Sequence, residues 1–145
     1  MIRPVTEDEA LNLIIEVFKP YWPNESDAWF KKEIHYADYS LSLGYYLNEK
    51  LVGVYLLSGN NHPDSPFEGK GLEGMALAIK KEFQNQGIGS KLVRFAQSNP
   101  TFNYTWGVTA KKLNNKDFWL KHRAIIKEKD LESFISFQEF RPSDK

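Results

Sequence analysis

The 145-residue sequence has no cysteine, no long apolar run and no excess of either charge. Without cysteine, the chain cannot form a disulfide, a thiolate metal site or an acyl-cysteine intermediate. No stretch approaches the roughly 20 apolar residues that a membrane-spanning helix needs. Nineteen basic and nineteen acidic residues cancel, so nothing favours nucleic acid or an anionic membrane as a partner.

Histidine is also scarce, and the first residues lack the features of a targeting segment. The three histidines show no metal-ligand spacing, so we predict no metal site. Residues 1–9 are charged and contain no apolar core, which argues against a signal peptide. We therefore expect a cytoplasmic protein. Hydrophobic residues make up 41% of the sequence and aromatic residues 14%, which is enough for a real core in one domain spanning residues 1–145.

Periodicity and punctuation predict a mixed α/β fold. Thr6 and Glu9 have capping-box spacing and precede a helix to Phe18, and Ser26 caps a second helix predicted over 27–37. The sequence then predicts a hairpin of strands 41–47 and 51–57, a surface loop over 58–71, a strand over 72–79, a helix over 90–97, a strand over 102–109, a short helix over 116–121, and a final strand pair at 124–127 and 133–140. A mixed sheet with helices on both faces follows.

The segment around the central glycines carries the chemistry. An apolar strand runs into Gln84-Asn85-Gln86-Gly87-Ile88-Gly89-Ser90, and a helix follows at once. Glycines there let the backbone turn tightly and present N–H groups at a helix N-terminus, which suits an anion such as a pyrophosphate. Taken alone, Gly87-Ile88-Gly89 is equally typical of an ordinary strand-to-helix turn. The glycine spacing fits neither a Rossmann fingerprint nor a P-loop.

In context, this segment resembles motif A of the GNAT superfamily of acyl-CoA-dependent N-acyltransferases, whose signature is Gln/Arg-x-x-Gly-x-Gly/Ala. Gln84, Gly87 and Gly89 occupy its fixed positions. The order of predicted elements extends the resemblance over nearly the whole chain. It implies a GNAT-type, mostly antiparallel sheet of about seven strands, with a central splayed parallel pair and about four flanking helices.

The resemblance also implies a cofactor site. In the family, backbone amides of this turn hold the pyrophosphate of coenzyme A, the motif strand pairs with the pantetheine arm, and an asparagine lies near the short helix. The residues that this assigns to acetyl-CoA are Leu77, Ala78, Ile79, Gln84, Asn85, Gln86, Gly87, Ile88, Gly89, Ser90 and Asn115. Acetyl-CoA is expected as the acyl donor.

Acetyl transfer needs an unprotonated amine, because an ammonium has no lone pair for attack. Glu73, at the start of the motif strand, lies where histone-type members of the family place a catalytic glutamate, so we predict that it is the general base and contacts the acceptor. The alternative is a solvated charge at a strand end.

The residue that protonates the leaving thiolate is less clear. The family often uses a tyrosine on the short helix, but Trp119 stands at that position. His122 is the substitute that we predict, against the alternative of a surface residue or helix cap, and Tyr104 is a weaker candidate. The thiolate can also leave unaided.

The end of the second helix lines the acceptor side in similar folds, which points to His35 and Tyr36 as substrate-binding residues. Further candidates are Tyr39, Trp22, Trp29 and a loop containing His62, Asp64 and Phe67, although such aromatics are more often core residues.

The sequence thus predicts an N-acetyltransferase that acts directly on a primary amine of a small molecule or protein. A homodimer is the assembly that the resemblance suggests, and the oligomeric state cannot be read from the sequence. One alternative is a non-catalytic GNAT-fold protein that binds acyl-CoA as a sensor or interaction module. Another is a different acyl donor, such as succinyl-CoA or a longer-chain acyl-CoA. The acceptor cannot be named from the sequence.

Overall fold

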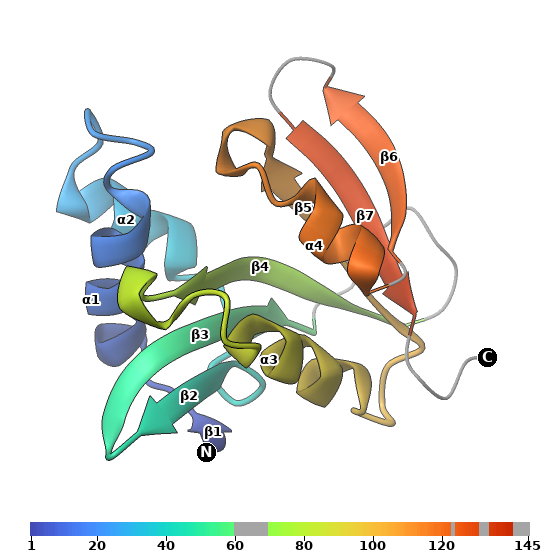
Figure 1. Cartoon of the computed structure of the whole chain (residues 1–145), viewed down its shortest axis with the longest axis horizontal. Coiled ribbons are helices and arrows are strands. Elements are labelled where there is room, and N and C mark those ends of the chain that lie inside the picture. The colour runs from blue at the N-terminus through green and yellow to red at the C-terminus, as the bar shows by residue number, and fades with distance from the viewer. Residues whose placement is uncertain (60–69, 123, 131–133, 141–145) are drawn as a thin grey trace. The chain divides into compact units, whose positions relative to one another are not determined.

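Helices and strands follow one another in the order that the sequence predicts (Figure 1). The computed structural model describes residues 1–59, 70–122, 124–130 and 134–140. These residues fall into two compact units. Unit 1 comprises residues 1–58 and 75–93, and unit 2 comprises the described residues of 59–74 and 94–145. The strand β4 (Gly71–Ile79) and the helix α3 (Ile88–Gln97) contribute residues to both units.

Unit 1 opens with a short strand and a capped helix. After β1 (Ile2–Pro4), the Thr6 hydroxyl accepts a hydrogen bond from the Glu9 backbone N–H at 3.2 Å, and the Glu9 side chain accepts one from the Thr6 N–H, also at 3.2 Å. This reciprocal pair is the predicted capping box, and it begins α1 (Glu7–Phe18).

The second helix, α2 (Asp27–Ile34), is capped by the predicted Ser26 but is shorter than expected. The prediction extended it to residue 37. Instead, the N–H groups of His35 and Ala37 bond to carbonyls three residues earlier, at Lys32 and Ile34, so the chain tightens and leaves the α-helical path.

The strands of unit 1 hydrogen-bond in the order β1, β2 (Leu43–Leu47), β3 (Lys50–Ser58) and the last residues of β4. Strand β2 starts later than predicted, because the N–H groups of Leu41 and Ser42 turn back to the carbonyl of Asp38. The tight β2–β3 turn places both Asn48 and Glu49 at positive φ, 49° and 66°, which matches the twist of a two-residue hairpin.

Alternation along β3 explains the two-sided packing of unit 1. Val54 and Leu56 belong to a buried cluster with residues of α1 and α2, including Ile14 and Ile34. Gly53 faces the opposite way, because a Cβ there would meet Ile79 at 2.6 Å and Ile88 of α3 at 3.4 Å. Helices α1 and α2 thus cover one face of β3, and the start of α3 covers the other (Figure 1).

Unit 2 contains the parallel strand pair. The first four residues of β4 pair in parallel with β5 (Tyr104–Ala110), in the register Gly71↔Tyr104 to Gly74↔Gly107. The strand order continues through β7 (Phe134–Phe140) to β6 (Ile125–Asp130), and both of these pairings are antiparallel. Helix α4 (Lys116–Lys121) follows β5 over the predicted residues.

The described residues form seven strands and four α-helices, and β4 pairs in parallel with β5, which agrees with the predicted fold class. Boundaries move by a few residues: α3 begins at Ile88 rather than residue 90, and β6 covers 125–130 rather than 124–127. Two short 3-10 helices, Lys81–Phe83 and Lys111–Leu113, were not predicted. Among the residues described, no helix is both long and apolar enough to span a membrane.

Candidate functional site

The turn between β4 and α3 is closed by the side chain of Gln84. Its amide nitrogen Nε2 donates a hydrogen bond of 2.9 Å to the carbonyl oxygen of Ile79, the last residue of β4. The fixed glutamine of the motif therefore ties the turn back to the strand, across the 3-10 helix Lys81–Phe83. Gln84 itself is exposed, so this bond shapes the turn without filling the space in front of it.

Two residues of the turn have left-handed backbone conformations, Asn85 with φ of 63° and Gly87 with φ of 83°. Asparagine tolerates this region and glycine adopts it freely. A Cβ built on Gly87 would meet no heavy atom within 4 Å, so steric crowding by the protein is not the reason for a glycine. The backbone conformation requires it, and the open space lets an anionic group approach the main chain.

Helix α3 starts directly after Gly87, whose carbonyl accepts the N–H of Lys91 at 3.0 Å. The first N–H groups of any helix have no carbonyl partner one turn earlier, and together they carry a partial positive charge. Ile88 is buried under the sheet and fixes the start of the helix. This strand–turn–helix fits the pyrophosphate of a coenzyme A, which needs N–H donors, positive potential and close backbone approach.

The predicted pantetheine residues lie at the end of β4, in the same unit as the turn. Ala78 is buried in the cluster shared with α1 and α2, whereas Leu77 and Ile79 are half-buried. Strand residues alternate between faces, so Ala78 points to the α1 side and its two neighbours to the α3 side. The structure thus gathers these three residues and the turn into one continuous stretch of unit 1.

In unit 2, Glu73 lies on β4 opposite Trp106 of β5 in the parallel register. Glu73 is half-buried, which leaves both the base and the solvated strand-end charge open. The residues on either side, Leu72 and Gly74, are buried. Glu73 therefore has a fixed place in the sheet, and its role as a base stays a prediction.

Asn115 precedes α4, as predicted, but its side chain does not cap the helix. Its oxygen Oδ1 accepts a hydrogen bond of 3.0 Å from the hydroxyl of Thr109 on β5. The asparagine therefore joins the strand end to the helix start. Trp119 is buried with 3% of its surface exposed and packs edge-to-face against Phe118, with ring centroids 4.9 Å apart.

His122 ends α4 and is buried rather than exposed, with its ring 4.8 Å from that of Phe118. Burial, reinforced by the positive charges of Arg94 and Lys121, lowers the pKa of His122 to about 4. The imidazole is therefore neutral at pH 7 and carries no readily released proton. This disfavours the predicted role of His122 as the acid that protonates the thiolate.

The acceptor-side residues lie in unit 1, where His35 follows α2 directly and Tyr36 comes next. Tyr36 is 70% exposed, and the ring centroids of these two residues are 5.6 Å apart. Nitrogen Nδ1 of His35 lies 3.2 Å from Oε1 of Glu7, in the first turn of α1. The sequence did not predict this contact, because nothing in the spacing of residues 7 and 35 indicates that they meet.

The further aromatic candidates for the acceptor side differ in their surroundings. Trp22 and Trp29 pack with Phe18 and Phe30 between α1 and α2, which supports the structural interpretation. Tyr39 donates its hydroxyl proton to the carbonyl of Ile34 at 2.7 Å. The candidates His62, Asp64 and Phe67 lie outside the described residues.

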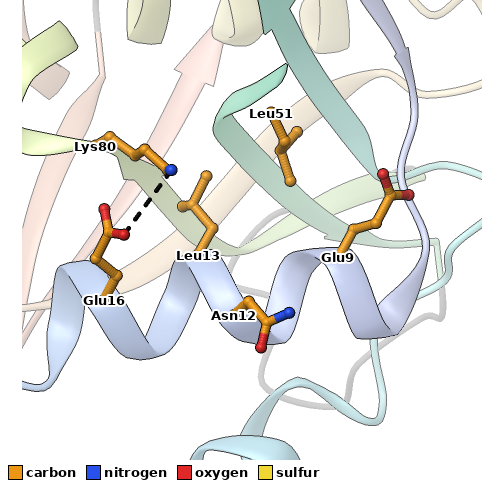
Figure 2. Close-up of a pocket in the computed structure, with 6 residues that line it drawn as sticks. All are labelled: Glu9, Asn12, Leu13, Glu16, Leu51 and Lys80. Carbon is orange, nitrogen blue, oxygen red and sulfur yellow. Dashed lines mark ion pairs between the residues drawn. The ribbon is translucent and has the colours of Figure 1, made fainter. Parts of the chain in front are cut away.

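A separate pocket of about 200 Å³ opens beside α1 (Figure 2). It contains none of the predicted site residues, and its lining is formed by Glu9, Asn12, Leu13, Glu16, Leu51 and Lys80. Its charged side chains have structural partners. Glu9 belongs to the capping box and accepts a hydrogen bond from the Tyr46 hydroxyl, and Glu16 forms an ion pair with Lys80 at 3.8 Å. We therefore assign the pocket no part in the chemistry.

No group of three His, Asp or Glu side chains in the described part of the chain could hold a metal ion. The absence of a metal site in the whole protein stays a prediction.

Comparison with known proteins agrees with this geometry. Residues 9–121 match the acetyltransferase (GNAT) family. The PaiA N-acetyltransferase of Thermoplasma acidophilum, solved with coenzyme A, is similar in fold with a TM-score of 0.68 at 16% identity, over 97% of this chain and 98% of that one. PH1933 of Pyrococcus horikoshii has a TM-score of 0.75 at 12% identity, over 97% and 98% of the two chains.

Ard1 of Thermoplasma volcanium gives a TM-score of 0.72 at 12% identity, over 97% of each chain. No curated protein sequence matches the chain significantly. The family match indicates acyl-CoA-dependent acetyl transfer. The chain belongs to the GNAT acetyltransferase family, as its sequence predicts.

Proposed function

We propose that this protein transfers an acetyl group from acetyl-CoA directly to a primary amine of a small molecule or a protein. The observation that carries the proposal is the turn before α3, where Gln84 clamps β4 and Gly87 leaves open space in front of its left-handed backbone. Membership of the family indicates acyl-CoA-dependent acetyl transfer. A neighbour of similar fold was solved with coenzyme A, which supports the choice of donor.

In this proposal, the N–H groups at the start of α3 bind the pyrophosphate, and the end of β4 orients the pantetheine arm. The amine nitrogen attacks the thioester carbon, the carbon–sulfur bond breaks, and coenzyme A leaves as the thiol. Glu73 accepts a proton from the nitrogen, directly or through a water molecule. No covalent acyl-enzyme is required, and the chain has no cysteine that could form one.

The leaving thiolate needs no dedicated acid from α4. Trp119 stands where a tyrosine is usual in the family, and an indole N–H is a poor proton donor. His122 is neutral at pH 7, as its lowered pKa requires. We therefore propose that the thiolate takes its proton from the reacting nitrogen through Glu73, or from water.

The test is release of free thiol from acetyl-CoA in the presence of primary amines. A suitable panel contains n-butylamine, benzylamine, lysine methyl ester and a peptide with a free α-amino group. Amine-dependent thiol release, with a product heavier by one acetyl group, is the expected result. Thiol release that no amine accelerates would contradict the proposal. Succinyl-CoA in place of acetyl-CoA tests the acyl preference in the same assay.

A second function has one specific observation in its favour. The substitution of tryptophan at the usual tyrosine position of α4 suits a protein that binds acyl-CoA without transferring the acyl group. Calorimetric binding of acetyl-CoA without turnover on any amine would favour this sensor function. A cytoplasmic location and a homodimer are further proposals, and sedimentation tests the dimer.

A further inference from the structure

The pocket beside α1 has charged ends and an apolar floor. Its volume of about 200 Å³ is below the roughly 300–1,000 Å³ of pockets for drug-sized ligands, so it suits a smaller molecule. All of its lining residues belong to unit 1. Figure 2 shows Leu13 and Leu51 between Glu9 at one end and the ion pair of Glu16 with Lys80 at the other.

The carboxylate of Glu9 is held in place by three hydrogen bonds. Its oxygen Oε1 accepts from the N–H and the hydroxyl of Thr6, at 3.2 and 3.0 Å, and Oε2 accepts from the hydroxyl of Tyr46 at 3.1 Å. The bond from the Thr6 N–H, partly opposed by burial, holds the pKa of Glu9 below its usual range, so the group is charged at neutral pH. A carboxylate has about four acceptor sites, so these bonds leave one for a further donor.

All three of these donors to Glu9 are neutral groups. In the described part of the chain, no ion pair joins Glu9 to a cation. The charge of Arg3 acts on Glu9, but Arg3 forms its own ion pair with Glu49 at 3.2 Å and lies 3.9 Å from the ring centroid of Tyr46. Among the described residues, the negative charge at this end of the pocket therefore has no direct counter-ion.

At the other end of the pocket, Glu16 and Lys80 balance each other. The Lys80 nitrogen lies 3.8 Å from Oε1 of Glu16, which is longer than a charge-assisted hydrogen bond of about 2.7–2.9 Å. With Glu9 included, the lining carries two negative charges and one positive charge. The pocket therefore favours a cation over an anion.

The floor of the pocket suits an alkyl chain. Leu13 is 3% exposed and belongs to the buried core, whereas Leu51 is half-buried at the start of β3. Gly44 of β2 leaves the space that Leu51 fills, because a Cβ at Gly44 would meet Cδ1 of Leu51 at 2.8 Å. The two leucines thus offer a fixed apolar surface beside the Glu9 carboxylate.

We propose that this pocket binds a primary alkylammonium ion, with the ammonium on the remaining acceptor site of Glu9 and the alkyl chain over Leu13 and Leu51. The ammonium supplies both the hydrogen-bond donor and the positive charge that this end of the pocket accepts. An anion would be repelled by two carboxylates. The site uses no residue of the turn between β4 and α3 and needs no acyl donor, so the inference does not rest on the proposed acetyl transfer.

The test is titration of the wild-type protein with n-hexylamine, followed by amide NMR shifts at about pH 7 and low ionic strength, without acetyl-CoA. We expect a dissociation constant of about 1–10 mM for so small a ligand, with shifts centred on residues 9–16, 51 and 80. The alcohol 1-hexanol has the same chain without the charge and should bind about 10-fold more weakly. Ethylamine should also bind more weakly, because each buried methylene contributes up to about fourfold in affinity.

Glu9→Gln tests the charge without removing the helix cap, because a capping box accepts glutamine as well as glutamate at this position. We expect n-hexylamine to bind this variant about 10-fold more weakly than wild type. Asp8→Asn is the matched control. It removes the same charge from the neighbouring residue, which is exposed in the first turn of α1 and does not line the pocket, so the affinity should stay unchanged. Melting temperatures show whether both variants are folded.

Three results would overturn this inference: amide shifts confined to another surface, wild-type affinity in folded Glu9→Gln, or 1-hexanol binding as tightly as n-hexylamine. If Glu9→Gln does not fold, the shifts and the comparison of amine with alcohol decide the question on the wild-type protein. None of these measurements involves thiol release. A protein that binds the amine in this pocket but transfers no acetyl group would keep this inference and lose the proposed function.

Discussion

The side-chain amide of Gln84 donates a hydrogen bond of 2.9 Å to the main-chain carbonyl of Ile79. This bond explains why the motif needs a hydrogen-bonding side chain at position 84. It ties the turn back to the last residue of β4.

Gln84→Met should loosen the turn while keeping the side-chain length. The lost bond is worth about 1 kcal/mol, so we expect acetyl-CoA affinity to fall by about 5- to 10-fold. Isothermal titration calorimetry measures this directly. The melting temperature should change little, because Gln84 is exposed. Unchanged affinity would show that the bond to Ile79 is not required for binding.

Gly89→Glu should weaken acetyl-CoA binding sharply, because it places a negative charge at the start of α3. Two like charges about 4 Å apart repel by about 4 kcal/mol near a protein surface, so a loss of 100-fold or more is expected. Gly89→Gln is the matched control, since it adds nearly the same bulk without the charge. A folded Gly89→Glu protein with wild-type affinity would refute a pyrophosphate site at this turn.

Glu73→Gln should lower kcat by about 10²- to 10⁴-fold, as expected for the loss of a positioned base. The amide keeps the size of the side chain but cannot accept the proton. Coenzyme affinity should barely move, because the turn lies beyond the other end of β4. Raising the pH should partly restore the rate, because more of the acceptor amine then arrives neutral. Wild-type turnover would reduce Glu73 to a strand-end charge.

Trp119→Tyr should retain activity, because the buried indole fills space and does not transfer protons. The backbone carbonyl of Trp119 accepts from the N–H groups of His122 and Ala124, both at 3.0 Å, and any side chain keeps these bonds. Comparison with Trp119→Phe isolates the added hydroxyl: a faster tyrosine variant would mean that it donates to the thiolate. Loss of turnover in both variants, with binding and stability intact, would give the indole a role in the chemistry.

His122 should make stability depend on pH. Its folded-state pKa is lowered to about 4, whereas an unfolded histidine titrates near 6.5. Between these values the unfolded chain binds a proton that the folded chain does not. Stability is therefore full above about pH 6.5 and falls as the pH drops toward 4.

Urea denaturation at about pH 7, 5.5 and 4.5 measures this dependence. His122→Leu should show a smaller fall in the free energy of unfolding over the same range, whatever its stability at pH 7. Equal falls in the two proteins would show that other groups, such as carboxylates, control the acid range.

Much of the fold could be predicted from short-range sequence signals. Thr6 with Glu9 and the Ser26 cap are short-range devices, and each begins a helix where the sequence predicts. The glycine turn was predictable for the same reason, since its left-handed Gly87 and its helix start are fixed by adjacent residues. Helix ends were less predictable. Helix α2 ends at Ile34 because of main-chain hydrogen bonds, and no side chain in the sequence indicates where they form.

Long-range contacts explain what the sequence could not predict. The approach of Glu7 to His35 arises from the packing of two helices, and neither residue signals it. Asn115 stands directly before α4, yet its side-chain oxygen accepts from the hydroxyl of Thr109 rather than from a helix N–H. His122 looked like a surface residue or a proton donor, and its burial beside Phe118 changes its chemistry.

Strand β4 can report the local unfolding of both units, because its residues are divided between them. Its residues Gly71–Gly74 belong to unit 2, and its residues Met75–Ile79 belong to unit 1. Amide hydrogen exchange along this one strand therefore samples the protection of both units within a single nine-residue peptide. The glycine turn belongs to unit 1. Acetyl-CoA bound at this turn would therefore slow deuterium uptake more at the carboxyl-terminal amides of β4 than at its amino-terminal amides.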